Sequence, residues 1–133
     1  MFDALFDRFR APLDLVGRIG LSAIFVLAGY GKIGGYAGTA GYMESMGVPG
    51  ALLPLVILVE LGGGIAVLLG LFTRPVALAL AGFCILSGFL FHSSGDQMQQ
   101  TMLMKNLAIA GGFLVLAATG AGAWSLDSRL KKK

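Results

Sequence analysis

Residues 51–72 form an uninterrupted apolar run, ALLPLVILVELGGGIAVLLGLF, in which Glu60 is the one charged residue. A helix of this length, at about 1.5 Å per residue, crosses a hydrocarbon core of about 30 Å. A carboxylate at such a depth needs a counter-charge, a water-filled cavity or a proton. The run therefore predicts a transmembrane helix with a polar group near its centre.

Three other apolar stretches have similar lengths, so we expect four transmembrane helices, at residues 12–32, 51–72, 75–92 and 101–121. Hydrophobic residues make up 56% of the chain and charged residues only 13%, which is typical of a membrane protein. The short link at 73–75 predicts that the two middle helices form an antiparallel hairpin. The predicted fold is an all-α membrane protein, with a single transmembrane domain over residues 1–133 built as an antiparallel four-helix bundle.

Positive charges are concentrated at one set of helix ends. Seven of the ten Lys and Arg residues lie in the terminal segments or in the turn after the second helix: Arg8, Arg10, Arg74, Arg129 and Lys131–Lys133. The opposite ends hold only Lys32 and Lys105. By the positive-inside rule, this asymmetry predicts that both termini are cytoplasmic. The pI of about 9.3 therefore reflects membrane topology, and no nucleic-acid partner is expected.

The N-terminal residues 1–11 predict a short helix that lies on the lipid bilayer. Phe2, Leu5, Phe6 and Phe9 recur at helical spacing, with charged residues between them. Acidic residues interrupt this segment and no A-x-A-like site follows the first apolar run, so we expect the first transmembrane helix to stay uncleaved.

Six polar residues are candidates for a pocket inside the bundle: Arg18, Lys32, Glu60, His92, Lys105 and Asn106. Depth arithmetic places Arg18 about four residues, or roughly 6 Å, to the cytoplasmic side of its helix midpoint, within reach of Glu60. We therefore expect an Arg18–Glu60 ion pair, with the alternative that Arg18 pairs with Asp14 one turn earlier. The other four residues belong to the outer half of the bundle and would form a mainly cationic vestibule above Glu60. Gly63 and Gly64 follow Glu60 at helical spacing and predict close packing of another helix.

These residues fit two interpretations. Lys32 can extend to the headgroups and His92 can cap a helix end, in which case the polar groups only hold the bundle together. Ionisable residues within membrane helices are equally candidates for a functional site. No metal site is predicted, because the soft ligands His92, Met98, Met102 and Met104 have no second His or Cys beside them. The single Cys84 excludes an intramolecular disulfide and a CxxC couple, so a redox role requires a quinone or a partner protein.

Five segments in chain order resemble the DoxX family of small bacterial membrane proteins: GYGKIGGYAGT (29–39), MGVPG (46–50), VELGGGIAVLLGLFTRP (59–75), FLFHS (89–93) and MKNLAIAGGFLVL (104–116). The resemblance covers roughly residues 13–122. It implies a four-helix bundle in a bacterial inner membrane, with Lys32, Glu60 and the turn residue Arg74 at family-motif positions. Some members of the family are subunits of quinone-linked oxidoreductases, including a thiosulfate–quinone enzyme, and others are linked to redox stress.

The resemblance favours a redox-associated inner-membrane protein with a pocket for a non-covalently bound quinone or similar small molecule. Lys32, His92 or Lys105 would bond to a carbonyl oxygen, while Glu60 or His92 would exchange protons. Any catalysis would belong to a quinone-linked oxidoreductase that includes partner proteins, because no domain for a flavin or an iron–sulfur centre is recognisable. The alternative is a non-enzymatic scaffold or anchor subunit for a membrane redox or stress-response complex. A transporter is disfavoured because the four spans show no inverted repeat.

Overall fold

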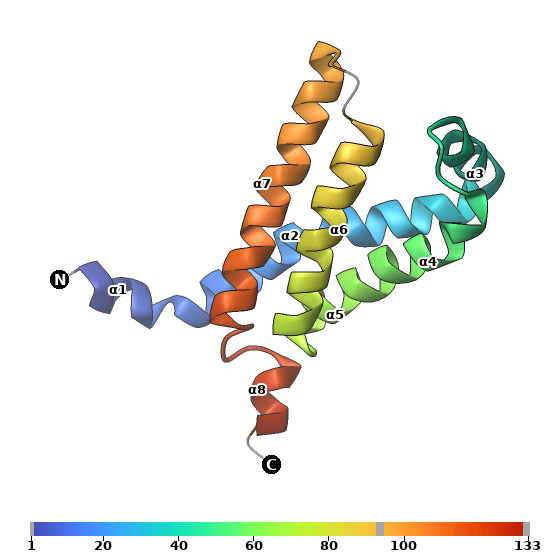
Figure 1. Ribbon diagram of the computed structural model, residues 1–133. Coiled ribbons are helices and arrows are strands. Elements are labelled where there is room, and N and C mark those ends of the chain that lie inside the picture. The colour runs from blue at the N-terminus through green and yellow to red at the C-terminus, as the bar shows by residue number, and fades with distance from the viewer. Residues whose placement is uncertain (1, 93–94, 132–133) are drawn as a thin grey trace.

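The structure is a computed structural model that describes residues 2–92 and 95–131, and every regular element in these residues is helical. In chain order the elements are α1 (Phe2–Arg8), α2 (Arg10–Gly34), α3 (Tyr36–Ser45), the 3₁₀ turn η1 (Gly50–Leu52), α4 (Leu53–Ile57), the π-helical segment η2 (Leu58–Gly62), α5 (Gly63–Leu69), α6 (Thr73–Phe91), α7 (Gln97–Thr119) and α8 (Leu126–Lys131) (Figure 1).

Four of these helical stretches are long and apolar enough to cross a membrane, so the all-α, four-span prediction is confirmed. They cover Arg10–Gly34, Gly50–Leu69, Thr73–Phe91 and Gln97–Thr119. The second stretch ends three residues before the predicted boundary, because Gly70 adopts a left-handed conformation (φ 71°) that stops α5. The fourth begins four residues early, since the polar sequence Gln97–Gln100 is helical although its composition resembles a loop.

The four spans form two antiparallel hairpins, one of α2 with α4–α5 and one of α6 with α7, so the predicted hairpin of the two middle spans is wrong: α6 crosses α5 after the short turn. The hairpins cross and then diverge, one toward α3 and the other toward the α6–α7 loop (Figure 1). Their crossing is filled by an apolar cluster that includes Phe25, Val67, Leu80 and Phe113. Phe25 meets the ring of Phe113 edge-on at a centroid distance of 5.4 Å. This cluster fixes the point beyond which the hairpins separate.

Glycine sets the register of the first hairpin. A Cβ at Gly29 would lie 2.9 Å from the backbone nitrogen of Leu61, and one at Gly64 would lie 3.1 Å from that of Val26. α2 therefore approaches η2 and α5 at backbone distance. Gly63 packs instead against Leu80 of α6. The close packing predicted at Gly63 and Gly64 is confirmed, and it involves a different helix at each position.

At the end of the bundle opposite α3, charged side chains bind the free backbone groups of helix ends. The guanidinium of Arg18, which is 1% exposed, donates to the carbonyls of Val67 (3.1 Å), Leu68 (2.8 Å) and Trp124. Asp127 accepts hydrogen bonds from the amides of Phe72 (2.7 Å) and Thr73 (2.8 Å), at the start of α6. Because helix ends leave carbonyl and amide groups unpaired, these contacts stabilise both ends of the α5–α6 turn.

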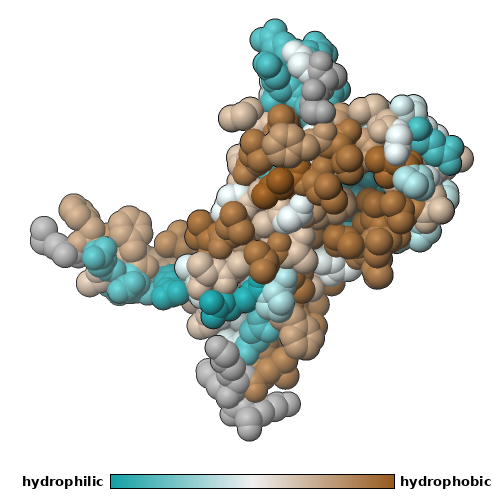
Figure 2. Space-filling view, in the orientation of Figure 1, coloured by the Kyte–Doolittle hydropathy of each residue, from teal (hydrophilic) through white to brown (hydrophobic). Residues whose placement is uncertain are grey.

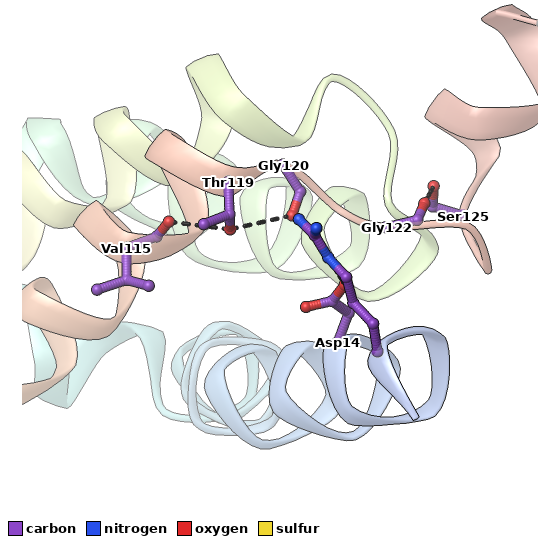
Figure 3. A network of polar contacts seen from close by, with 7 residues as sticks. Asp14, Val115, Thr119, Gly120, Gly122 and Ser125 are labelled. Carbon is purple, nitrogen blue, oxygen red and sulfur yellow. Dashed lines mark hydrogen bonds and ion pairs between the residues drawn. The ribbon is translucent and has the colours of Figure 1, made fainter. Parts of the chain in front are cut away.

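Further side-chain hydrogen bonds stabilise the C-terminal end of α7 and the turn that follows it. Arg74 Nε donates to the carbonyl of Ala117 at 2.7 Å. The hydroxyl of Thr119 bonds to the carbonyl of Val115, and Ser125 bonds to that of Gly122 near Asp14 (Figure 3). Arg74, the residue at the family-motif turn, is thus a structural residue that joins the start of α6 to the end of α7.

Side chains of different polarity separate along the molecule. Hydrophobic residues cover the crossing hairpins on the face seen in Figure 2, whereas hydrophilic residues gather at the α6–α7 loop, at α3 and near the two termini. The predicted N-terminal helix is present as α1 and projects away from the bundle, with the side chains of Phe2, Leu5, Phe6 and Phe9 exposed. Its placement on the lipid surface stays a prediction.

Candidate functional site

The two hairpins enclose a cavity of about 480 Å³ in the half of the bundle where they diverge. One wall comes from α2, α3, α4 and η2, and the other from α6 and α7. The lining is mainly apolar, with Phe25 from the core cluster, Met43 from α3 and Phe83 from α6 among its members. A volume of this size lies within the range of small-molecule sites, roughly 300–1,000 Å³.

An ion pair lies in the wall of this cavity. Lys32 Nζ is 2.8 Å from Glu60 Oε1, and the two side chains are 28% and 7% exposed. Lys32 belongs to the C-terminal end of α2, next to α3, and Glu60 to the middle of the second span. Each charge therefore gains a partner at a depth where an isolated one is costly.

The predicted Arg18–Glu60 pair is wrong. Gly29 opposite Leu61 and Gly64 opposite Val26 place Arg18 level with the C-terminal end of α5, about 12 residues or roughly 18 Å along the helix from Glu60. The alternative pairing of Arg18 with Asp14 is also wrong, because the salt-bridge partner of Asp14 is Arg10, at 3.6 Å. Arg18 binds helix-end carbonyls instead.

Glu60 lies on the π-helical segment Leu58–Gly62, which interrupts the second span between α4 and α5. A π-helical turn accommodates one more residue than an α-helical turn and so changes the direction of the side chains that follow. In this position the Glu60 carboxylate reaches Lys32, while Leu61 packs on the bare backbone of Gly29. π-helical segments often occur at functional sites. No residue pattern in the sequence signalled this one.

His92 and Asn106 also line the cavity. His92 Nδ1 donates a hydrogen bond to Gln99 Oε1 at 2.7 Å. Asn106 Nδ2 donates to the carbonyl of Cys84 at 3.2 Å and to Ser87 Oγ at 3.4 Å, and these bonds join α7 to α6. Asn106 therefore has a structural role beside its place in the cavity wall.

The structure brings together five of the six residues expected to form a pocket: Lys32, Glu60, His92, Lys105 and Asn106 all line the cavity. Arg18 does not, for the reason given above. Lys32 comes from α2, Glu60 from η2, His92 from the residue that follows α6, and Lys105 and Asn106 from one turn of α7, so their proximity depends on how the hairpins cross.

An aromatic contact was missed from the sequence. The rings of Tyr42 in α3 and Phe91 at the end of α6 stack with centroids 5.7 Å apart and planes 25° from parallel. Both residues line the cavity, so the stack closes the space between the diverging hairpins on the α3 side. Tyr42 lies on the ten-residue helix α3.

Comparison with known proteins identifies the family. The DoxX family model matches residues 13–93. The chain is 58% identical to the inner membrane protein YqjF of Escherichia coli (strain K12) over 120 residues, which cover 90% of this chain and 92% of that protein. It is 39% identical to the inner membrane protein YphA of the same organism over 132 residues, with 93% and 94% coverage. No solved structure matches. The chain belongs to the DoxX family and is an integral, multi-pass protein of the inner membrane.

Proposed function

We propose that this protein binds a quinone, or a similar small lipophilic molecule, in the cavity between its hairpins, and that it does so as part of a membrane redox system. The observation that carries the proposal is the Lys32–Glu60 ion pair in the wall of a mainly apolar cavity of about 480 Å³. An apolar pocket with a few convergent polar groups is the arrangement expected of a small-molecule site.

The residues present fit the chemistry of a quinone head. Such a head is a flat ring whose carbonyl oxygens accept hydrogen bonds, and the cavity offers the ammonium groups of Lys32 and Lys105 as donors. The aromatic residues Phe25, Phe83 and Phe91 supply an apolar lining for the ring.

Reduction of a quinone takes up two electrons and two protons. Among the lining groups, His92 and Glu60 would exchange protons with the bound quinone. The chain's own residues would thus bind the ring and exchange protons, and a partner oxidoreductase would supply the electrons. This division of roles makes the protein a subunit of a quinone-linked system.

A second candidate function is that of a non-enzymatic scaffold or anchor subunit. The observation in its favour is α1, which projects from the bundle and exposes an apolar face made of Phe2, Leu5, Phe6 and Phe9. In that case the ion pair between Lys32 and Glu60 would serve only to fix α2 against η2, and its loss would lower stability without changing the affinity for any ligand.

The two candidates are separated by measuring quinone binding to purified protein in lipid nanodiscs. Decylubiquinone is titrated into wild type, Glu60→Gln and the matched control Glu44→Gln, whose carboxylate is exposed on α3 and lies outside the cavity lining. We expect saturable binding to wild type and Glu44→Gln, and binding weakened about tenfold in Glu60→Gln. Absence of saturable binding to wild type, with empty nanodiscs as the blank, would overturn the proposal.

A further inference from the structure

We infer that the cavity selects an amphiphile with a negatively charged head, and that Lys105 is the residue that recognises this charge. The inference rests on the proposed use of the cavity as a ligand site, and it goes beyond the quinone proposal by naming a charged class of ligand that the same cavity would prefer to a neutral one. Three features carry it: an uncompensated ammonium group, the charge balance of the lining, and a wall that continues onto the lipid-facing surface.

Lys105 lies in the third turn of α7 and lines the cavity, half-buried. Among residues 2–92 and 95–131, its ammonium group has no carboxylate within 4 Å and makes no hydrogen bond to the protein. This contrasts with Arg18, whose donors meet three carbonyls, and with Lys32, which meets Glu60. Because a charged donor in an apolar wall is costly without a partner, Lys105 is stabilised when an anion enters the cavity.

The other charged groups that line the cavity cancel one another, so the ammonium group of Lys105 is the surplus positive charge. α2 contributes Lys32, η2 contributes Glu60, and the end of α6 contributes His92. The Glu60 carboxylate is already paired with Lys32 at 2.8 Å. No other acidic residue of the described chain lines this cavity. The lining is therefore complementary to a monoanion, and the low polarity of the wall strengthens that attraction.

The opposite side of the cavity suits an apolar tail. Leu52 and Leu55 on one hairpin and Leu86 and Leu90 on the other line the cavity, yet they are 44%, 56%, 60% and 42% exposed. Residues that line a cavity and are also exposed mark the place where its wall passes into the outer surface. In a membrane that surface meets lipid chains, so the gap between α4 and α6 gives a ligand lateral access from the bilayer.

The ligand class that matches both features is a single-chain amphiphile with an anionic head, either a carboxylate or a phosphate. Its head would lie at Lys105 and its chain along the leucines between α4 and α6. A charge-assisted hydrogen bond to the ammonium group would favour such a ligand over a neutral amphiphile with the same chain. Lys105 thus acts as a determinant of specificity.

The test compares ligands that share a chain and differ in the head. Oleate, oleoyl-lysophosphatidate, oleyl alcohol and acetate are titrated into protein in phosphatidylcholine nanodiscs, with empty nanodiscs as the blank for partition into lipid. We expect at least one of the two anionic lipids to bind about tenfold or more tightly than oleyl alcohol, and acetate to show no saturable binding. The tighter of the two anionic lipids identifies the carboxylate or the phosphate as the preferred head.

Variants assign the preference to one side chain. Lys105→Met should reduce the affinity for the anionic lipid to that for oleyl alcohol, whereas Lys105→Arg should retain the preference. Arg129→Met is the control, because it removes one positive charge from an exposed position of α8 outside the cavity. Thermal unfolding of each variant confirms that the fold is intact.

The binding measurements distinguish failure of this inference from failure of the quinone proposal. Equal affinity of wild type for the anionic lipids and oleyl alcohol, or a preference that survives in Lys105→Met, would overturn it. If decylubiquinone binds saturably while the anionic lipids show no preference, this inference fails and the quinone proposal stands. If neither class of compound binds saturably, both fail.

Discussion

Two buried charged groups inside the membrane spans are stabilised in different ways. Arg18 is almost completely buried and donates to the carbonyls of Val67, Leu68 and Trp124, so that its charge is dispersed over helix-end dipoles. Glu60 is 7% exposed and is balanced by the single charge of Lys32. Arg18 is therefore a structural residue, and Glu60 is a residue whose partner also faces a cavity.

Loss of the Arg18 guanidinium should lower the free energy of unfolding. Arg18→Met would leave carbonyls at the end of α5 and at Trp124 without their donor, and we expect a loss of about 3 kcal/mol in the free energy of unfolding. Equilibrium unfolding in mixed micelles can be followed by the fluorescence of Trp124, the one tryptophan in the chain. Arg129→Met, on the exposed side of α8, should change the free energy by less than about 0.5 kcal/mol. Equal stabilities of the two variants would contradict a structural role for Arg18.

The pair between Lys32 and Glu60 should show a coupling energy in a double-mutant cycle. Lys32→Met leaves a buried carboxylate without its cation and should cost more than Glu60→Gln, because the lysine side chain is 28% exposed and can extend toward the headgroups. The double variant should be more stable than Lys32→Met, with a coupling of about 1–3 kcal/mol measured by equilibrium unfolding. Purely additive effects would show that the two charges do not interact in the membrane.

At the residue scale, the sequence predicted which polar groups would gather but not how they would pair. The pairing of Arg18 with Glu60 was predicted from the depth of each residue, counted from the span boundaries. That count assumed that both helices begin and end where their apolar residues do. The true register depends on which glycines face which backbone atoms, and α2 extends to Gly34, so that Lys32 lies within a helix and opposite η2. A hydropathy profile does not show which glycine faces which backbone atom.

The second span is the element on which the cavity depends, because its π-helical segment and its glycines act together. Gly29 of α2 leaves space for the backbone of Leu61, and this contact holds Glu60 next to Lys32. Periodicity assigned the span correctly as a helix and its glycines as a packing face. The π-helical turn could not be predicted from hydropathy. All its neighbours are apolar, so one extra residue in a turn does not change the pattern of the sequence.

A single methyl group should test the contact between α2 and η2. Gly29→Ala places a Cβ 2.9 Å from Leu61 N, closer than packed atoms approach, so we expect a destabilisation of about 1–3 kcal/mol and weaker ligand binding. Gly31→Ala, two residues away on the same helix, meets no atom within 4 Å and should be neutral or stabilising by up to about 1 kcal/mol. Unfolding and decylubiquinone titration of the two variants give the comparison. A neutral Gly29→Ala would contradict the observed register.

For the whole molecule, the decisive feature is the crossing of two hairpins, which makes a cavity from residues distant in the sequence. The four spans and the family were predictable from hydropathy and from ordered motifs. The crossing was not, because it depends on a compact cluster in which Phe25 meets Phe83 and Phe113 edge-on. The stacked pair of Tyr42 and Phe91 at the far side could not be inferred for the same reason.

The orientation of the molecule in the membrane is a separate prediction. The concentration of Arg and Lys near the termini and at Arg74 predicts that both termini are cytoplasmic. Green fluorescent protein fused after residue 133 should fluoresce, while alkaline phosphatase at the same position should be inactive. The phosphatase inserted at Gly95, in the α6–α7 loop, should be active. The reverse pattern would show that the cavity opens toward the cytoplasmic half of the membrane.

Photoaffinity labelling is the most direct test of a ligand site between the hairpins. An azido-quinone is irradiated with the protein in nanodiscs, and the labelled residues are mapped by mass spectrometry with and without excess decylubiquinone. Labelling that the competitor removes should fall on the C-terminal halves of α2 and α6 and on the second span near Glu60, which line the cavity. Labelling confined to α1, to α8 or to lipid-facing positions outside the cavity, or labelling that the competitor leaves unchanged, would contradict a quinone site in this protein.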